Sequence, residues 1–398
     1  MTNISGIHLL FIAIMSLFAG SFITDKVTLL KRLHIPSPVT GGLLFCIILT
    51  IYSHLTTIQL NYDLHLRDIL LLVFFSTIGL SARMRLLISG GKTLIILIFV
   101  TIAFLIIQNT AGILTAIALG QDPIFGLLAG TITFAGGHGT AITWGAFLEQ
   151  QGYEGAVEFG LVAATLGLIL GGLVGGPIGK KLITRYRLKE ASKQKITASY
   201  QEPEVQFVPL NGKHLLSAIF LISCCIVFGQ IAQDLLKAHN ILFPDFVPVL
   251  FVGILIANLC DFGKEKLRQP ELDMLGDVCL RLFIAMSLIT LKLQHLTNVA
   301  GVLVCITVVQ VLIIIAFAWL VVFRATGRNY DSSIITAGFI GMGLGATPVG
   351  MANMNTLTNR YGLSPKAFLI VPLIGSFFVD IANAIILKGF LELPVFKG

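Results

Sequence analysis

The chain consists of long apolar runs separated by short polar loops. An apolar run of about 20 residues has the length of an α-helix that crosses the hydrocarbon core of a bilayer. A transmembrane β-barrel would instead show shorter segments of alternating polarity. The pattern therefore predicts an all-α membrane protein whose transmembrane helices lie at residues 7–23, 38–57, 67–86, 93–118, 155–182, 214–237, 244–261, 271–292, 297–323 and 364–391.

Two further apolar segments, 122–148 and 331–357, are interrupted by glycine-rich stretches. The first contains AGGHGT at 135–140, and the second contains GMGLGATP at 341–348. Glycine destabilises a helix and leaves the backbone bare, and irregular backbone persists at membrane depth only where protein packs around it or where it lines a wet cavity. We therefore predict two re-entrant hairpins whose tips meet near the membrane midplane and form a transport site.

The two halves of the chain repeat at a constant offset of 208 residues. The offset pairs Pro36 with Pro244, Gly130 with Gly338, Gly137 with Gly345, Tyr153 with Tyr361, and Gly167 with Gly375. Each half holds an odd number of predicted spans, so the second half is expected to enter the membrane with the opposite orientation. The predicted organisation is an N-terminal repeat (1–183), a basic linker (184–213) and a C-terminal repeat (214–398).

Composition and charge support a membrane location. The chain is 56% hydrophobic and 12% charged, whereas an average soluble domain carries about 25% charged residues. The net charge of +7 could suggest a nucleic-acid partner, but the Lys and Arg residues lie mostly in short loops, which is how membrane orientation is encoded. Their distribution predicts that both termini lie outside the cell and that nucleic acid is not a partner.

The cysteines and the first apolar run add no further function. The six cysteines lie in or at the ends of apolar runs, without metal-ligand spacing or a disulfide framework. We interpret them as small packing residues. The run from about Ile7 to Ile23 has neither a basic segment before it nor a small-residue cleavage site, so we expect a retained helix rather than a signal peptide.

The two predicted tips carry the chemistry expected of a site for a carboxylate and a cation. Half-helix N-termini offer N–H donors and a positive dipole end to an anion, and carbonyls freed by a break can coordinate Na⁺. Thr133, Thr140 and Thr347 add hydroxyl groups, and Gly343 adds a freed carbonyl. The alternative is that the glycines only allow close helix packing, which fits the helically spaced Gly171, Gly172, Gly175 and Gly176. A lone His138 is compatible with an ordinary structural hydrogen bond.

Asp380 is the most informative single residue. It lies mid-span in the last predicted helix, where ionisable groups are costly and usually line an ion or substrate path. Asn383, three residues on, shares its face of the helix, and the oxygens of this pair suit Na⁺ or a substrate ammonium group. The alternative is a structural ion pair, for which Arg281 is the candidate partner.

Other polar residues have weaker assignments. Gln108 and Asn109 in the fourth span could gate or cap the site, and Asn353 and Asn355 after the second break could reach a carboxylate. The sequence contains no nucleophile–base set, phosphate-binding loop or metalloprotease motif, so we do not expect an enzyme. The absence of a Walker lysine argues against ATP-driven transport by this chain.

A set of short motifs, in order along the chain, resembles that of a known family. They lie at 35–42 (IPSPVTGG), 67–68 (RD), 76–80 (STIGL), 136–140 (GGHGT), 343–348 (GLGATP), 352–354 (ANM) and 377–383 (FFVDIAN). Each motif is weak alone, but together the chain resembles the bacterial sodium/glutamate symporters over nearly its whole length. Two departures are Ala135, where the family pattern has Ser, and Arg281, where it has no basic residue.

The resemblance implies Na⁺-coupled uptake of L-glutamate across the bacterial inner membrane, with no organic cofactor. It also implies ten spans with two re-entrant hairpins, an inverted repeat, a homodimer and an elevator mechanism. The alternatives are a Na⁺- or H⁺-coupled transporter of another small carboxylate, such as aspartate or a citrate-like acid, or a channel. The predicted substrate-binding residues are Gly136, Gly137, His138, Gly139, Thr140, Gly345, Ala346, Thr347, Asn353 and Asp380. The predicted Na⁺ ligands are Thr133, Gly343, Asp380 and Asn383.

Overall fold

The computed structural model describes residues 2–32, 35–56, 58, 60–83, 91–188, 211–239, 243–262, 269–291 and 300–396. The described chain is mostly helical, with turns between the helices and two three-residue strands, β1 (Thr2–Ile4) and β2 (Leu60–Tyr62). The strands pair in parallel, with Thr2 opposite Leu60. This pair, which the sequence pattern did not predict, ties the N-terminus to the segment that precedes α4. Most of the predicted linker, at 189–210, lies outside the described residues.

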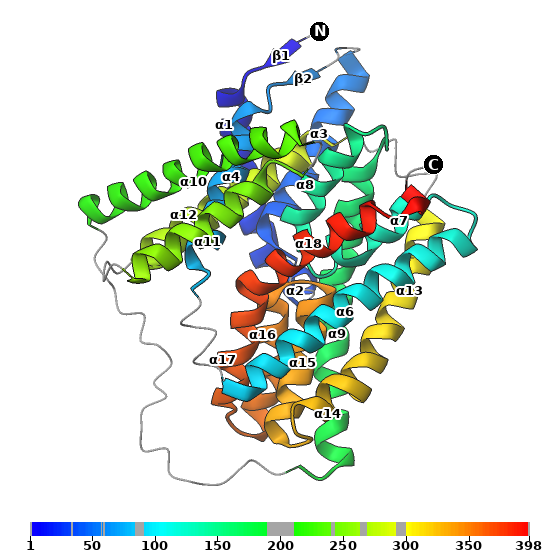
Figure 1. The fold of residues 1–398 in the computed structure, drawn as a ribbon. Coiled ribbons are helices and arrows are strands. Elements are labelled where there is room, and N and C mark those ends of the chain that lie inside the picture. Colours follow the sequence, from blue (N-terminus) through cyan, green and yellow to red (C-terminus); the bar gives the residue numbers. More distant parts are fainter. Residues whose placement is uncertain are drawn as a thin grey trace.

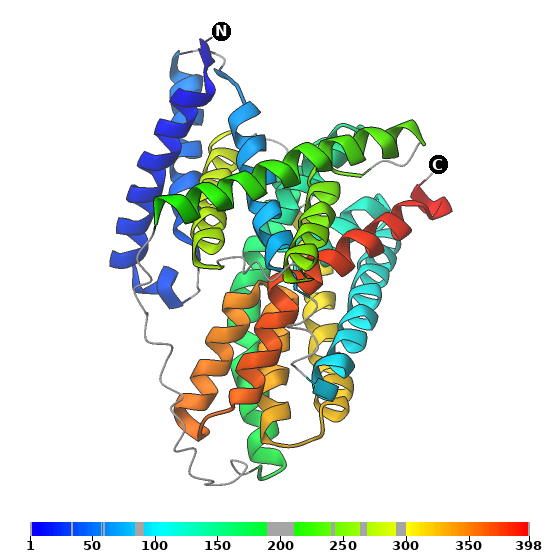
Figure 2. The same cartoon turned by 60° about the vertical axis from the view of Figure 1, so that its left-hand side comes forward.

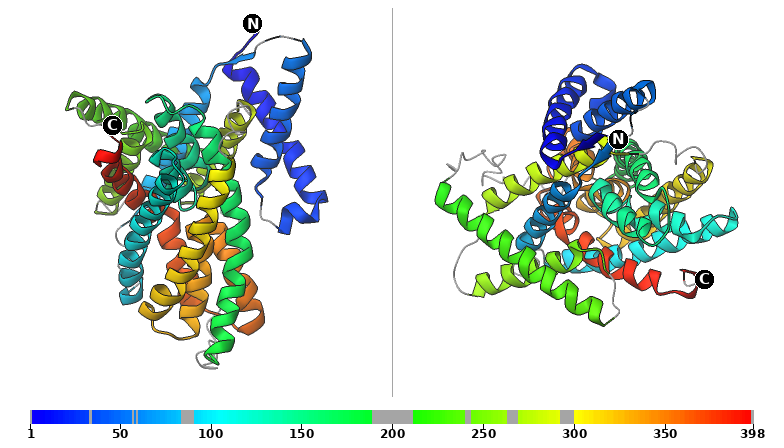
Figure 3. Two further views of the ribbon diagram at one scale, coloured as in Figure 1. Left: turned by 90° about the vertical axis from the view of Figure 1, so that its right-hand side faces the viewer. Right: turned by 90° about the horizontal axis from the view of Figure 1, so that it is seen from above.

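One group of helices, here called the first bundle, is built around α4 (Figures 1 and 2). Its members are α1 (Gly6–Lys26), α3 (Ser37–Thr56), α4 (His65–Ser81), α10 (Gly212–Ala238), α11 (Phe246–Phe262) and α12 (Gln269–Ile289), and the short α2 (Thr28–Arg32) follows α1. Glycine allows these helices to approach closely: a Cβ on Gly79 would lie 2.4 Å from the carbonyl oxygen of Leu250. Figure 3 shows α1 and α3 at one edge of the molecule.

The remaining helices form a second bundle. Its members are α6 (Gly91–Ala118), α7 (Pro123–Leu127), η1 (Leu128–Ile132), α8 (Gly137–Glu149), α9 (Ala156–Arg185), α13 (Ala300–Phe317), η3 (Ala318–Val322), α14 (Phe323–Ala325), α15 (Tyr330–Leu344), α16 (Thr347–Tyr361), α17 (Pro365–Leu373), η4 (Ile374–Phe378), α18 (Val379–Leu391) and η5 (Pro394–Phe396). The main hydrophobic core fills this bundle and extends to its border with α4, α11 and α12.

The two glycine-interrupted segments each form a helix, a break and a second helix. In Figure 1, α7 and α8 extend inward from the end of the molecule where both termini lie, and α15 and α16 extend inward from the opposite end. Their inner ends meet within the second bundle. We call residues 133–140 the first tip and residues 343–348 the second tip.

The offset of 208 residues also pairs secondary-structure elements in order. It superimposes the residue ranges of α3 on α11, α4 on α12, α6 on α13, α8 on α16, and α9 on the α17–η4–α18 segment. Each half therefore contributes helices to both bundles and one broken helix pair to the second. The sequence repeat thus has a counterpart in the order of the elements.

Six helices among the described residues are long and apolar enough to cross a membrane. They lie at Gly6–Lys26, Ser37–Thr56, Gly91–Ala118, Ala156–Arg185, Gly212–Ala238 and Gly301–Ala325. The prediction of an all-helical membrane protein is confirmed at this level. The other four predicted spans also contain helices, but α4 and α11 have 17 residues each. α12 carries several charged residues, and the last span is interrupted by Pro372 and the π-helical η4.

Candidate functional site

The two tips bring together two helix N-termini. α8 begins at Gly137 and α16 begins at Thr347, and in the described chain neither helix has a side-chain N-cap hydrogen bond. Gly137 has φ +72°, a conformation that favours glycine. A Cβ placed on Gly137 would lie only 3.4 Å from the carbonyl oxygen of Gly345. The two residues that the repeat pairs therefore lie next to each other in space.

This arrangement favours an anion between the tips. The first N–H groups of an α-helix have no intrahelical acceptor, and the helix dipole makes each N-terminus partly positive. The two helix starts lie on adjoining tips, which places these partial charges close together. Pro348 has no N–H group, and the N–H groups of Gly137 and Val349 donate to the carbonyls of Thr133 and Ala346, so these three positions supply no free donor. Backbone groups of this kind bind carboxylates and phosphates at helix N-termini.

Several predicted side chains of the first tip are engaged within the protein. The Thr140 hydroxyl donates to the Gly136 carbonyl at 2.9 Å. The Nε2 of His138 lies 3.0 Å from the Thr165 hydroxyl on α9, and the imidazole is buried. In this conformation the backbone, rather than these side chains, presents free donors at the tip, and His138 joins α8 to α9.

The first broken segment is held by amide side chains from three other helices. Ala129 and Gly130 have non-helical backbone angles. Asn109 Oδ1 accepts from the backbone N and the hydroxyl of Thr131, at 2.9 Å in each case, and Asn383 Nδ2 donates to the Thr131 carbonyl at 3.0 Å. Gln310 Nε2 donates to the Ala129 carbonyl at 3.2 Å. The polar groups freed by the break are therefore satisfied by buried side chains.

The same region contains buried oxygens without a hydrogen-bond donor. Within the described chain these are Gln108 Oε1, Thr133 Oγ1 and Gln310 Oε1, on residues that are fully buried. A buried polar atom without a partner costs free energy. A hard cation prefers oxygen ligands, so these three oxygens fit Na⁺. Thr133 is among the predicted ligands. Gln108 also donates from Nε2 to the Gly343 carbonyl at 3.0 Å.

The segment η4–α18 runs past both breaks. A Cβ on Gly375 would lie 2.3 Å from the Thr347 hydroxyl of the second tip, and Asn383 contacts Thr131 beside the first break. Asp380 lies between these two positions, one helical turn before Asn383, and is partly buried. No described residue makes a hydrogen bond or an ion pair with its carboxylate. The predicted alternative partner, Arg281, instead pairs with Asp277 at 2.8 Å.

Asn353 and Ala346 have different surroundings. Asn353 Nδ2 donates to the Gly171 carbonyl at 2.9 Å, so this buried side chain joins α16 to α9 rather than pointing between the tips. Ala346 is the extended residue that precedes α16. Asn355 is exposed. The structure thus brings the two tips together, with Thr133 in the first and Gly343 and Thr347 in the second. Asn353 lies six residues after Thr347, at the contact with α9.

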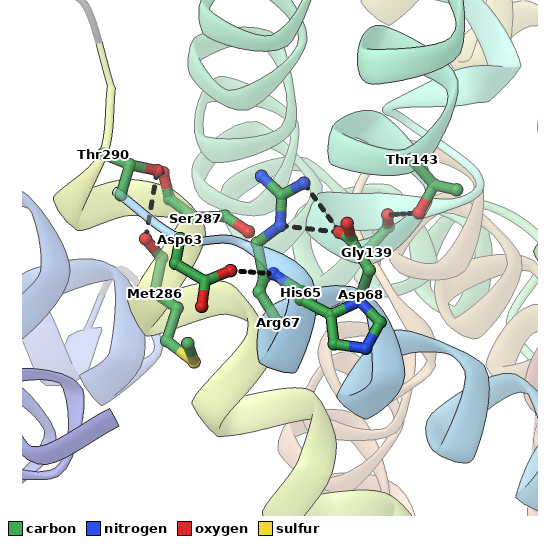
Figure 4. Close-up of polar contacts among 9 residues, drawn as sticks. All are labelled: Asp63, His65, Arg67, Asp68, Gly139, Thr143, Met286, Ser287 and Thr290. Carbon is green, nitrogen blue, oxygen red and sulfur yellow. Dashed lines mark hydrogen bonds and ion pairs between the residues drawn. The ribbon is translucent and has the colours of Figure 1, made fainter. Parts of the chain in front are cut away.

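Three contributors were not assigned from the sequence: Thr131, Gln310 and Arg67. Thr131 links both asparagines, and Gln310 bonds the break. Arg67 lines two cavities, of about 370 and 630 Å³, at the end of the molecule where the termini lie. A single amide in an otherwise apolar span was a signal for Gln310. Figure 4 shows Arg67 and Asp68 paired at the start of α4.

Comparison with known proteins identifies the family. The sodium/glutamate symporter profile matches residues 2–363. This chain belongs to the sodium/glutamate symporter family. The sodium/glutamate symporter of Escherichia coli (strain K12) is 40% identical over 390 residues, with 97% of each chain covered. That of Haemophilus influenzae is 37% identical over 383 residues, with 95% of each chain covered.

Family membership confirms the resemblance found in the motifs. Sodium/glutamate symporters are transporters, so the prediction that this chain is not an enzyme is also confirmed. With its six apolar helices, the chain is a multi-pass membrane protein. Among solved structures, the sodium proton antiporter MjNhaP1 from Methanocaldococcus jannaschii is 16% identical and covers 98% of this chain and 99% of its own. Its TM-score of 0.43 is too low to support an argument about this fold.

Proposed function

We propose that this protein carries L-glutamate into the cell by symport with Na⁺. The observation that carries the proposal is the meeting of the two tips at Gly137 and Gly345, beside two helices, α8 and α16, that begin at Gly137 and Thr347 without a side-chain N-cap. Such a pair of donors suits an anionic substrate with separate carboxylates. The names of the relatives, sodium/glutamate symporters, indicate the same substrate and coupling ion.

The substrate site consists of the backbone at Gly136–Thr140 and Gly345–Thr347, with Asp380 beside it. The tips bind the carboxylates, and the Asp380 carboxylate binds the substrate ammonium group or Na⁺. The Na⁺ ligands are Thr133, Gly343, Asp380 and Asn383. The buried oxygens of Gln108 and Gln310 without donors, on the helices that flank the first break, support a cation in this region. Asn353 acts by holding the second tip against α9.

The second bundle is the moving part of the transporter. We place both broken helix pairs in the membrane as re-entrant hairpins and both termini outside, in a ten-span inverted repeat. The second bundle slides against the first in an elevator motion, and two copies associate as a homodimer in the bacterial inner membrane. Two smaller hydrophobic clusters lie wholly within the first bundle and support this division, while the main core extends from the second bundle across the border to α3, α4, α11 and α12.

Coupling follows if the empty and the fully loaded second bundle cross the membrane and the partly loaded one does not. The unpaired charge of Asp380 supplies the physical reason, since an uncompensated ion is costly at membrane depth. Na⁺ or the substrate ammonium group compensates it. Each net positive charge carried inward gains roughly 2.3 kcal/mol per 100 mV of membrane potential.

Uptake by the purified protein in proteoliposomes tests the proposal. We expect accumulation of radiolabelled L-glutamate when Na⁺ is higher outside, and none when K⁺ replaces Na⁺. Unlabelled aspartate and citrate are added as competitors to define the carboxylate class. Glutamate flux that ignores the Na⁺ gradient would contradict symport, and flux without accumulation against a gradient would indicate a channel.

A further inference from the structure

Arg67 occupies a defined position at the N-terminal end of α4. The turn before it is fixed by Asp63, which accepts from the backbone N–H groups of Gly6 and His65 at 3.3 and 3.1 Å. Arg67 is largely buried, with 15% of its side chain exposed, whereas 56% of the Asp68 side chain is exposed. The guanidinium group is therefore held in place by the fold, and its carboxylate partner lies more in solvent.

The pairing leaves part of the guanidinium group free. Both Nε and Nη2 donate to the same oxygen of Asp68, Oδ1, at 2.9 and 2.7 Å. Arginine has five N–H donors, and across the described residues Nη1 has no acceptor. The edge formed by Nη1 and Nη2 thus remains available for a second carboxylate, in the two-bond geometry that arginine and carboxylates favour.

Arg67 lines two adjoining cavities, which also share Ala146 and Gln150. The smaller cavity follows α8 inward from Gln151 to Ile142. The larger one is lined by acidic residues of the α8–α9 region, namely Glu149, Glu154 and Glu158. An arginine opposite several carboxylates suits a ligand with both an anionic and an ammonium group.

The smaller cavity leads toward the first tip but does not reach it. Gly139, one turn beyond Ile142, faces α4 and α12: a Cβ there would lie 3.4 Å from Leu280 and 3.7 Å from Phe74. Leu280, Phe74 and Gly139 line neither cavity, so a ligand bound at Arg67 would lie apart from the first tip.

We propose that Arg67 is the residue that first binds the substrate. A carboxylate of the amino-acid substrate enters the cavities beside α8, binds the guanidinium group and displaces Asp68 from it. The proposal rests on the proposed function, since it takes the substrate to be an anionic amino acid. Arg67 acts on capture rather than on the translocation step. Asp68 acts as a competitor for the guanidinium group.

Opposite effects of the two partners distinguish capture from a structural ion pair. We expect Arg67→Gln to raise KM for L-glutamate about tenfold, the equivalent of one charge-assisted contact, with little change in kcat. We expect Asp68→Asn to lower KM by roughly two- to fivefold, the range of an exposed ion pair. Arg67→Lys should fall between wild type and Arg67→Gln, because an ammonium group lacks the planar fork.

The measurement is initial uptake into proteoliposomes over a range of glutamate concentrations at fixed Na⁺, with membrane insertion quantified for each variant. Arg281→Gln is the matched control, since Arg281 pairs with Asp277 but lines neither cavity, and its KM should equal that of wild type. Parallel losses in Arg67→Gln and Asp68→Asn, or an unchanged KM in Arg67→Gln, would overturn the proposal. If wild type itself shows no Na⁺-driven uptake, the proposed function fails instead.

Discussion

At the scale of single residues, Asp380 is a partly buried carboxylate of the second bundle with which no described residue makes a hydrogen bond or an ion pair. The sequence identified it by its depth in an apolar run, and the structure adds that Arg281 does not neutralise it. The segment η4–α18 that contains it lies beside both breaks, through Gly375 of η4 and Asn383 of α18. In the proposed mechanism, a carboxylate in this position receives a cation from outside the protein when the second bundle moves.

The unpaired carboxylate predicts the behaviour of Asp380→Asn. The amide has the same shape without the charge, so the variant should insert normally and lose Na⁺-driven glutamate uptake down to background. Uptake in proteoliposomes, with and without a Na⁺ gradient, measures the effect. Asp277→Asn is the control, because Asp277 lies on an exposed part of α12. An Asp380→Asn protein that kept the Na⁺ dependence of wild type would refute the role.

Residue chemistry could be predicted from sequence only where the residue type itself was unusual. A charge or a glycine run in an apolar segment is visible without a structure, as Asp380 and residues 135–140 show. Hydrogen-bond partners are not visible, because they depend on which helices become neighbours. Thr131 resembles any other threonine until Asn109 and Asn383 are seen to converge on it. His138 was open between ligand and structural residue for the same reason.

At the scale of elements, some glycines allow close helix packing and others form the tips. The sequence alone distinguishes these two roles only in part. Gly171 and Gly175 on α9 face α15 and α16, where a Cβ on Gly175 would meet Asn353. These glycines allow close packing, as expected from their spacing. Gly137 instead has a left-handed backbone and abuts Gly345. The breaks followed from the glycine pattern, but the π-helical segments η1, η3 and η4 had no comparable signal.

Gly137→Ala tests whether the tip depends on this close approach. Alanine at positive φ is strained by roughly 1–2 kcal/mol, and its methyl group would lie 3.4 Å from the Gly345 carbonyl oxygen, in van der Waals contact with the second tip. We expect a loss of more than tenfold in kcat/KM for glutamate uptake. Gly152→Ala is the matched control, since Gly152 has φ +99° but no atoms within 4 Å of an added Cβ. Equal losses in both variants would mean that backbone strain alone, and not the tip, explains the effect.

At the scale of the whole molecule, the repeat and the charge distribution together predict an inverted arrangement of the two halves. Neither feature predicts that arrangement alone. The offset of 208 pairs elements in order, and the two broken helix pairs extend inward from opposite ends (Figure 1). The six long apolar helices were predictable from hydropathy. Other spans were harder to predict from hydropathy. α12 contains several charged residues, and η4 interrupts the last span beside the candidate site.

Two repeat-related surface residues test the inverted topology directly. Gln151 follows α8 and Asn359 lies near the end of α16; they are separated by the offset of 208, and both are exposed. In a background without the native cysteines, we expect a membrane-impermeant maleimide to label Gln151→Cys in intact cells and Asn359→Cys only in inside-out vesicles. A parallel repeat would place both on one side, so that one preparation would label both. Because the pair is matched in sequence position and exposure, a difference in labelling reports the side of the membrane and not local structure.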